Sequence, residues 1–311
     1  MGQVTKIPTR DMTREQWVES RRNSIGGSDA AALLGLNPYA SPFSLWAEKT
    51  GAVVPEDISM KEAVRLGHVL EPYVAQRFTE LTGKKVRREN YILKNADYPW
   101  AHANVDRLVI GEKAGLECKT TSALNLSKFK NGEYPANYYC QCMHYLAVTG
   151  LERWYLAVLI GNQEVRVFVI ERDEDEIKAL MDMEAQFWAQ VESGIAPLPD
   201  GSESSSRAIS QLYADEGGEC DLTPLVSGLR EYLALKAQIK ELTEKCDSLG
   251  NRIKEYMGTA SKGSAPEYRV SYGSQIRKTF DKKAFLKDHP GMDLSPWEKV
   301  STSRVFSVKG V

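Results

Sequence analysis

Asp106, Glu117 and Lys119 have the residue types and the spacing of a metal-dependent hydrolytic site. Short apolar runs lie on either side of Gly111 and Glu112, which predicts a β-hairpin with a two-residue turn. In that register Asp106 lies directly opposite Glu117, while Glu117 and Lys119 point to the same face of the sheet. Two adjacent carboxylates repel each other unless a cation lies between them, and oxygen ligands at that spacing suit Mg²⁺ or Mn²⁺. The hairpin therefore predicts the metal site of a nuclease.

The same residues could belong to a surface hairpin without a functional site, because acidic and basic residues are common on exposed hairpins. Here Glu117 and Lys119 interrupt runs that are otherwise apolar, and this favours a functional role. His102, four residues before Asp106, is a further candidate ligand, although a structural role suits it better. Cys140 and Cys142 could be read as a metal or redox pair, but no second Cys/His cluster accompanies them.

Length and composition indicate a globular protein. The chain has 311 residues, of which 42% are apolar and 26% charged, enough for one large domain and a smaller appendage. No run approaches the roughly 20 apolar residues of a membrane span, and residues 1–10 are too polar for a signal peptide, so we expect a cytoplasmic protein. The five cysteines lie in apolar patterns and are expected to be reduced core residues.

The charge is unevenly distributed along the chain. The net charge is −2, but residues 262–311 carry ten Lys or Arg and five Asp or Glu, which makes this tail +5 and leaves −7 for the remainder. A basic appendage on an acidic body indicates a polyanionic partner such as DNA.

Hydrophobic periodicity predicts a mixed α/β core. Besides the hairpin, strands are expected at 85–93, 152–160 and 164–171, and helices at 13–22, 29–34, 44–50, 60–82, 135–149 and 173–191. The core-facing stripe of the 60–82 helix is expected to contain Leu66, Leu70, Val74, Phe78 and Leu81. Glu71 lies beside that stripe, and Gln141 and Tyr145 share a helix face.

The glycine-rich segment 23–29 has two interpretations. Its amide groups, the Ser28 hydroxyl and Arg21 or Arg22 could bind a phosphate. It could equally be an ordinary loop and helix cap, since the glycine spacing of dinucleotide or P-loop sites is missing.

The C-terminal third is expected to be a separate appendage. We predict a domain at 1–200, a linker at 201–220 and a helical and basic α+β appendage at 221–311. Apolar residues between Tyr232 and Tyr256 recur every three or four positions, which predicts a long helix with a coiled-coil-like seam. The seam could pair with another chain or fold back on the body. Short strands at 268–272 and 300–308 and a basic helix at 282–287 complete the prediction.

Several motifs together resemble those of a known superfamily. Glu71, Asp106, Glu117-x-Lys119 and Gln141-x-x-x-Tyr145 occur in the order and spacing of PD-(D/E)xK nucleases. Within that superfamily, residues 13–200 resemble the phage λ exonuclease or YqaJ-type viral recombinase family, through Trp17-x-x-x-Arg21, Ser28, the hairpin and the segment 169–174. Val105 replaces the proline that some members carry before the aspartate. The implied fold is a restriction-endonuclease-like core, a mixed sheet flanked by helices.

The resemblance implies roles for individual residues. Asp106, Glu117 and the carbonyl of Cys118 would hold Mg²⁺, or Mn²⁺, and Glu71 would help to hold a second ion. Lys119 would orient or deprotonate the attacking water, and Gln141 would hydrogen-bond a phosphate or that water. Arg21, Ser28 and Tyr145 would bind DNA at its 5′-terminal phosphate.

The resemblance also implies an activity and partners. It implies a 5′-to-3′ exonuclease that digests linear duplex DNA and leaves 3′ single-stranded tails for an annealing protein, with a trimeric ring as a possible assembly. The alternatives are an endonuclease or nickase on the same core and a DNA-end-binding protein without activity. A guided-adaptation nuclease of the Cas4 type is disfavoured, because the four cysteines of an iron–sulfur cluster are missing.

Overall fold

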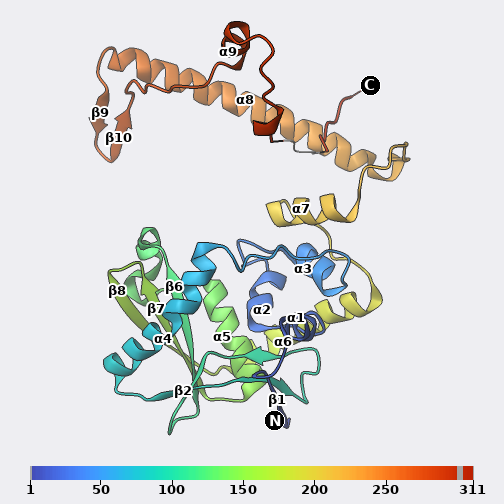
Figure 1. Ribbon diagram of the computed structural model, residues 1–311, viewed down its shortest axis with the longest axis vertical. Helices are drawn as coiled ribbons and strands as arrows, with labels where there is room; N and C mark the ends of the chain where they lie inside the picture. Colours follow the sequence, from blue (N-terminus) through green and yellow to red (C-terminus); the bar gives the residue numbers. More distant parts are fainter. Residues whose placement is uncertain (1, 300–303, 311) are drawn as a thin grey trace. The chain divides into compact units, whose positions relative to one another are not determined.

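The protein consists of two units in the computed structural model, which describes residues 2–299 and 304–310 (Figure 1). The first unit ends at Ala214 and the second begins at Asp215.

A five-stranded mixed sheet forms the centre of the first unit, in the order β2-β5-β6-β7-β8. The central pair β6–β7 is parallel, and the other neighbours are antiparallel. The strands span Val86–Arg88 (β2), Arg107–Val109 (β5), Ala114–Thr121 (β6), Arg153–Ile160 (β7) and Glu164–Glu171 (β8). The mixed sheet and its flanking helices confirm the expected α/β fold.

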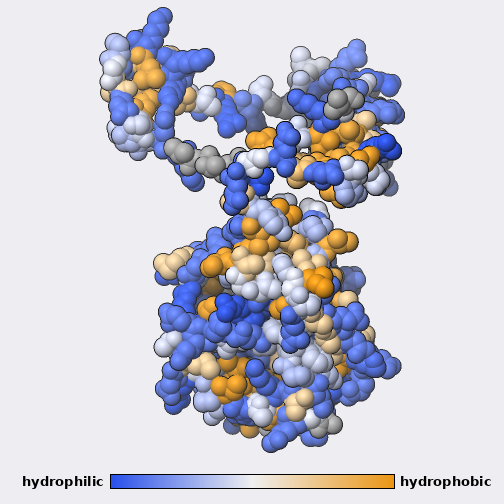
Figure 2. All heavy atoms as spheres, turned by 90° about the vertical axis from the view of Figure 1, so that its right-hand side faces the viewer, coloured by the Kyte–Doolittle hydropathy of each residue, from blue (hydrophilic) through white to orange (hydrophobic). Residues whose placement is uncertain are grey.

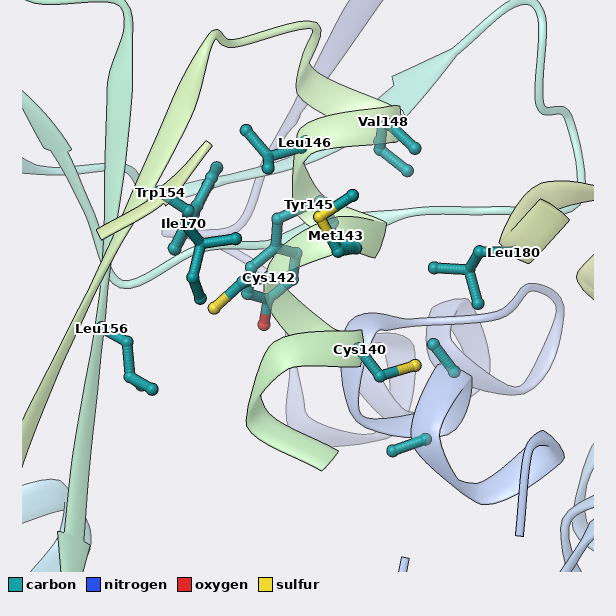
Figure 3. Close-up of a cluster of buried hydrophobic side chains, with 14 of the residues drawn as sticks. Cys140, Cys142, Met143, Tyr145, Leu146, Val148, Trp154, Leu156, Ile170 and Leu180 are labelled. Carbon is teal, nitrogen blue, oxygen red and sulfur yellow. The ribbon is translucent and has the colours of Figure 1, made fainter. Parts of the chain in front are cut away.

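Alternate residues of the central strands face two different helices, as the two-residue period of a β-strand requires. Tyr155 and Leu116 pack against Phe78 of helix α4 (Glu62–Thr82). Trp154 and Leu156 face helix α5 on the other side (Ala136–Thr149). Figure 3 shows side chains of α5 pointing toward these sheet residues, with others, including Met143 and Cys140, directed away from the sheet. Helix α5 is consequently buried on nearly all sides, and any polar group on it needs a partner.

Five further helices and a small sheet complete the first unit. Helix α1 has Thr13 as its N-cap, in a capping box with Gln16. The helices span Arg14–Arg22 (α1), Gly27–Leu33 (α2), Pro42–Lys49 (α3), Glu174–Ser193 (α6) and Glu203–Leu212 (α7), with a 3₁₀ segment η1 at Ala123–Gly132. The second sheet has the order β1-β3-β4 and consists of Val4–Pro8, Tyr91–Asn95 and Ala103–Asn104.

The structure corrects two expectations for elements of this unit. The strand expected at 85–93 is two strands in different sheets, and the chain leaves the first at Glu89, which forms ion pairs with Lys6 and Arg87. Leu66 and Leu81 are exposed, because the buried part of α4 is its middle, around Val74 and Phe78.

The segment expected to be a linker, 201–220, contains helix α7. Ser202 caps this helix, and the Ser205 hydroxyl lies 2.8 Å from that of Ser41 at the start of α3. The serine-rich composition therefore serves caps and buried hydrogen bonds at 202–205. The division between the units falls within the expected linker, after Ala214.

The second unit contains one long helix, α8 (Val226–Met257), preceded by a 3₁₀ turn, η2 (Thr223–Leu225). A two-stranded sheet, β9 (Lys262–Ala265) and β10 (Tyr268–Ser271), follows, then helix α9 (Lys282–Asp288) and a 3₁₀ turn, η3 (Ser295–Trp297). Of the strand expected at 300–308, residues 300–303 lie outside the described residues and 304–308 form no strand. Cys220 and Cys246 are exposed, so the expectation that all cysteines are core residues is wrong for these two. No helix among the described residues is both long and apolar enough to span a membrane.

Candidate functional site

The predicted hairpin is present in the expected register. Arg107 pairs with Leu116 and Leu108 with Gly115, which is the pairing that the two apolar runs predicted. The connection is longer than expected, because β5 ends at Val109 and β6 begins at Ala114. Asp106 immediately precedes β5, outside the ladder.

The backbone of Cys118 fixes the Asp106 carboxylate. The Cys118 N–H donates to Oδ2 of Asp106 over 2.8 Å. In a β-strand the N–H and C=O of one residue point to the same side, so the Cys118 carbonyl is directed toward Asp106 as well. The Cys118 N–H thus fixes the Asp106 carboxylate next to the strand that carries Glu117 and Lys119.

Glu117 is the central side chain of the site and is only 3% exposed. Its Oε1 lies 2.6 Å from Nζ of Lys119 and accepts a 2.8 Å hydrogen bond from Nε2 of Gln141. Gln141 Nε2 also lies 2.8 Å from the Tyr145 hydroxyl. Oε2 of Glu117 is buried and has no hydrogen-bond partner among the described residues. An unsatisfied buried carboxylate oxygen is costly, and a bound cation would satisfy it.

The electrostatics of the carboxylate pair agree with this geometry. Burial raises the pKa of Asp106 well above its usual value, and the nearby Glu117 carboxylate raises it further. Burial opposes the charged form of Lys119, yet the Glu117 and Asp106 carboxylates outweigh burial and raise the pKa of the Lys119 ammonium. Two carboxylates and one cation therefore share a buried space, in which one more positive charge is favourable.

Glu71 reaches this area from α4, which covers the face of the sheet opposite to α5. Its Oε1 forms an ion pair with Nη1 of the buried Arg107, and that guanidinium also donates to the Asp106 carbonyl over 2.7 Å. The Glu71 carboxylate is near enough to contribute to the raised pKa of Asp106. Glu71 is thus beside the site, but its carboxylate is engaged by Arg107.

The glycine-rich turn lies against the same helix that carries Gln141. A Cβ on Gly27 would lie 2.6 Å from the Tyr145 ring and 3.0 Å from Cγ of Gln141, so only glycine permits this approach of α2 to α5. The next residue, Ser28, accepts a 3.1 Å hydrogen bond from Nη2 of Arg21, whose guanidinium stacks over the ring of Trp17. The structure therefore places the turn that carries Ser28, with Arg21 hydrogen-bonded to it, against the helix that carries Gln141 and Tyr145.

A buried ion pair supports this turn. Nζ of Lys49 lies 2.6 Å from Oδ2 of Asp29 and donates to the carbonyls of Arg21 and Ser24. Burial alone would raise the pKa of Asp29, but the Lys49 and Arg21 charges outweigh burial and lower it to about 2. The Asp29 carboxylate also accepts the N–H of Gly26 at the start of α2. These contacts fix the backbone on which Arg21 and Ser28 lie.

His102 has a structural role, and the ligand interpretation of this residue is not supported. Its Nδ1 lies 2.9 Å from the buried Ser24 hydroxyl, and its carbonyl accepts a hydrogen bond from Nε2 of His144. Burial lowers the pKa of His102 to about 3, so the ring is neutral at physiological pH. His144 in turn contacts Glu184 of α6 over 2.7 Å.

The residues fit a divalent cation in part. No group of three or more His, Cys, Asp or Glu side chains that could hold a metal is found among the described residues. The structure brings two of the predicted ligands, the Asp106 and Glu117 carboxylates, close enough to affect each other's charge, while the predicted ligand Glu71 is paired with Arg107. Oxygen ligands of this kind are those that Mg²⁺ and Mn²⁺ prefer.

Sequence reasoning missed a charged residue and an ion pair that position the site. Arg107 follows Asp106 directly, and a charged residue inside a short apolar strand was an available signal. The Lys49–Asp29 pair gave no local signal, because the partners lie on different helices. Tyr138, whose ring lies 5.6 Å from Nζ of Lys119, was also missed.

The chain is similar in sequence to a known protein family and to one curated protein along nearly its whole length. A family model described as the YqaJ-like viral recombinase domain matches residues 16–152. A protein named YqaJ from Bacillus subtilis (strain 168) is 39% identical over 307 residues, which cover 97% of this chain and 95% of that protein. The chain belongs to the YqaJ-like viral recombinase family. The matched domain contains every site residue discussed above from Trp17 to Tyr145.

Solved structures similar to this family member include an alkaline exonuclease, LHK-Exo, from Laribacter hongkongensis. It is 21% identical, with a TM-score of 0.48, and the match covers 64% of this chain and 100% of that chain. A structure of LHK-Exo in complex with dAMP has 22% identity, a TM-score of 0.49 and the same coverage.

Proposed function

We propose that the protein is a metal-dependent exonuclease that digests linear duplex DNA in the 5′-to-3′ direction. One observation carries the proposal: the buried Glu117 carboxylate, with one oxygen unsatisfied, lies between Lys119 and Gln141 and next to a second carboxylate, Asp106. Glu184 also has a buried oxygen without a partner, but its other oxygen pairs with the His144 ring, whereas Glu117 lies beside a second carboxylate and the Lys119 ammonium. Membership of a viral recombinase family supports DNA as the substrate.

Asp106, Glu117 and the Cys118 carbonyl would hold the first divalent ion. Mg²⁺ is the proposed ion and Mn²⁺ a substitute, since both take oxygen ligands. Such an ion polarises a phosphodiester and makes water a better nucleophile at neutral pH. Glu71 would contribute to a second ion if its carboxylate leaves Arg107.

Lys119 and Gln141 would act on the phosphate and the attacking water. The Lys119 ammonium, paired with Glu117, supplies a fixed positive charge where negative charge develops on the phosphate. The Gln141 amide is fixed between Glu117 and Tyr145, so its orientation is set before substrate arrives.

Arg21 and Ser28 would select the DNA end, with Tyr145 lining the same area. A guanidinium and a hydroxyl 3.1 Å apart can both contact one 5′-terminal phosphate, and the guanidinium contact would be charge-assisted. Binding of the end at this point gives 5′-to-3′ polarity and leaves a 3′ single strand. A single-strand annealing protein would be the partner that uses this product.

Digestion of matched DNA substrates tests the proposal. With Mg²⁺, linear duplex with 5′-phosphates should release nucleotides from 5′-labelled ends first, while closed circular duplex of the same sequence should stay intact. Cleavage of the circle would indicate an endonuclease or nickase instead. Binding of linear ends without hydrolysis under Mg²⁺ or Mn²⁺ would indicate a DNA-end-binding protein.

A further inference from the structure

Helix α8 has an apolar face that the described part of its unit leaves largely uncovered. The helix spans Val226–Met257, and none of its residues is buried. One end of the face is contacted, where the Tyr232 ring lies 5.7 Å from that of Phe306, but Leu242 is 60% exposed and Ile239 58% exposed. Apolar side chains, drawn in orange, are visible on the surface of this unit in Figure 2. Because most helical stability in proteins comes from packing of an apolar face, a 32-residue helix of this kind needs a partner.

Apart from Leu233, the large apolar residues between Tyr232 and Tyr256 follow a heptad. They fall at alternating steps of three and four, with positions a at Tyr232, Ile239, Cys246 and Ile253 and positions d at Leu235, Leu242, Leu249 and Tyr256. Positions e and g beside this seam are almost entirely polar or glycine, at Glu231, Lys236, Gln238, Thr243, Lys245, Gly250 and Arg252. A helix that packs on a globular body has a broader stripe that includes e or g, whereas an a/d-only stripe is the seam of a coiled coil.

The residue types on the seam indicate two parallel strands. β-Branched Ile at position a together with Leu at position d favours a parallel dimer over trimers and tetramers. In a parallel dimer each g residue faces the e residue of the next heptad on the other helix. Glu231 at g would therefore face Lys236 of a second copy, and the reciprocal pair would form as well. Among the described residues neither Glu231 nor Lys236 forms an ion pair, and the Lys236 ammonium lies 5.6 Å from the centre of the Tyr232 ring on its own helix.

We propose that α8 pairs with α8 of a second copy of this chain in a parallel two-stranded coiled coil. In this arrangement Cys246, a position a residue with an exposed thiol, lies opposite Cys246 of the partner copy. In an antiparallel pair, position a packs against position d, so the two thiols would be apart. The parallel dimer joins two copies of the chain along α8. The proposal is independent of the proposed exonuclease activity.

Mass measurement of the full-length protein tests the pairing. Sedimentation velocity should give an assembly with an even number of 34.8 kDa chains. Leu242→Glu, on the seam, should halve that number, while Ala237→Glu, the same added charge at outward position f, should leave it unchanged. An unchanged mass for Leu242→Glu would overturn the proposal, and an assembly of three chains would do so too. Tryptophan fluorescence, to which the first unit contributes five of the six tryptophans, would confirm that this unit folds in both variants.

Cysteine cross-linking and a charge exchange test the parallel orientation. In a Cys220→Ser background, mild oxidation should join two chains through Cys246, and Cys246→Ser should abolish the product. Glu231→Lys should weaken the dimer, and Glu231→Lys with Lys236→Glu should restore it. A dimer that is disrupted by Leu242→Glu but yields no Cys246 cross-link would contradict the parallel arrangement.

Discussion

Asp106→Asn should separate two effects of the adjacent Asp106 and Glu117 carboxylates: their mutual repulsion without metal, and their binding of a divalent cation. In the wild type, Asp106 and Glu117 repel each other in a buried space, so folding without metal carries an electrostatic cost. Asparagine removes one charge and keeps an oxygen that can accept the Cys118 N–H. We expect the variant without metal to be more stable than the wild type by about 1 kcal/mol.

With Mg²⁺ bound, the wild type should be more stable than Asp106→Asn. At a Mg²⁺ concentration about 100-fold above its dissociation constant, binding stabilises a protein by about 2.7 kcal/mol. For a unit of about this size, that corresponds to a rise in melting temperature of roughly 5–11 °C. The wild type should show this rise, and Asp106→Asn should show little of it because a ligand is lost. The assay is thermal unfolding followed by tryptophan fluorescence, since five of the six tryptophans lie in the first unit.

Asp182→Asn is the matched control, because Asp182 lies on the exposed face of α6 and pairs with Lys178. It should change neither the stability without metal nor the response to Mg²⁺. The reasoning would be refuted if Asp106→Asn gained the full metal-dependent stabilisation, or if Mg²⁺ and Mn²⁺ left the wild-type melting temperature unchanged.

Four further predictions concern other parts of the chain. Gly27→Ala should lower the free energy of unfolding by about 1–3 kcal/mol in equilibrium denaturation, because its Cβ would lie 2.6 Å from an aromatic ring; an unchanged midpoint would contradict that packing. Arg21→Ala should slow digestion of 5′-phosphorylated ends far more than that of 5′-hydroxyl ends, and equal slowing would make Arg21 structural. Neutralising Arg277 and Lys278 together should weaken duplex binding and reduce its salt dependence, as titrations at several salt concentrations would show; an unchanged salt dependence would exclude a DNA contact at these residues. Asp29 has a pKa of about 2 in the folded protein, below its ordinary 3.8, so its carboxylate stabilises the fold above about pH 4. This contribution of about 2 kcal/mol is lost as the pH falls toward 2. In acid titration, the free energy of unfolding of Asp29→Asn should not show this decrease.

Local patterns were sufficient to predict the hairpin of the site and its neighbours. The two-residue strand period placed Glu117 and Lys119 on one face, and the pairing register followed from the two apolar runs. The four-residue spacing of Gln141 and Tyr145 put them on one side of α5, where they share a hydrogen bond.

Contacts between distant segments could not be predicted in the same way. The division of the 85–93 segment depends on Glu89, whose partner Lys6 lies on a strand from the N-terminus. The engagement of Glu71 by Arg107 requires that α4 cover the sheet next to β5, which no local period reports. Helix α7 was missed because its serines suggest a linker, although their hydroxyls cap the helix and contact α3.

Hydrolysis of 5′-phosphorylated linear duplex DNA by the wild type and by Lys119→Ala, each with Mg²⁺ and with a chelator, tests the central claim most directly. We expect the wild type to release nucleotides only with the divalent ion, and Lys119→Ala to remain folded and bind DNA but release none. Hydrolysis by Lys119→Ala near the wild-type rate, or wild-type hydrolysis that persists in the chelator, would contradict the assignment of this site.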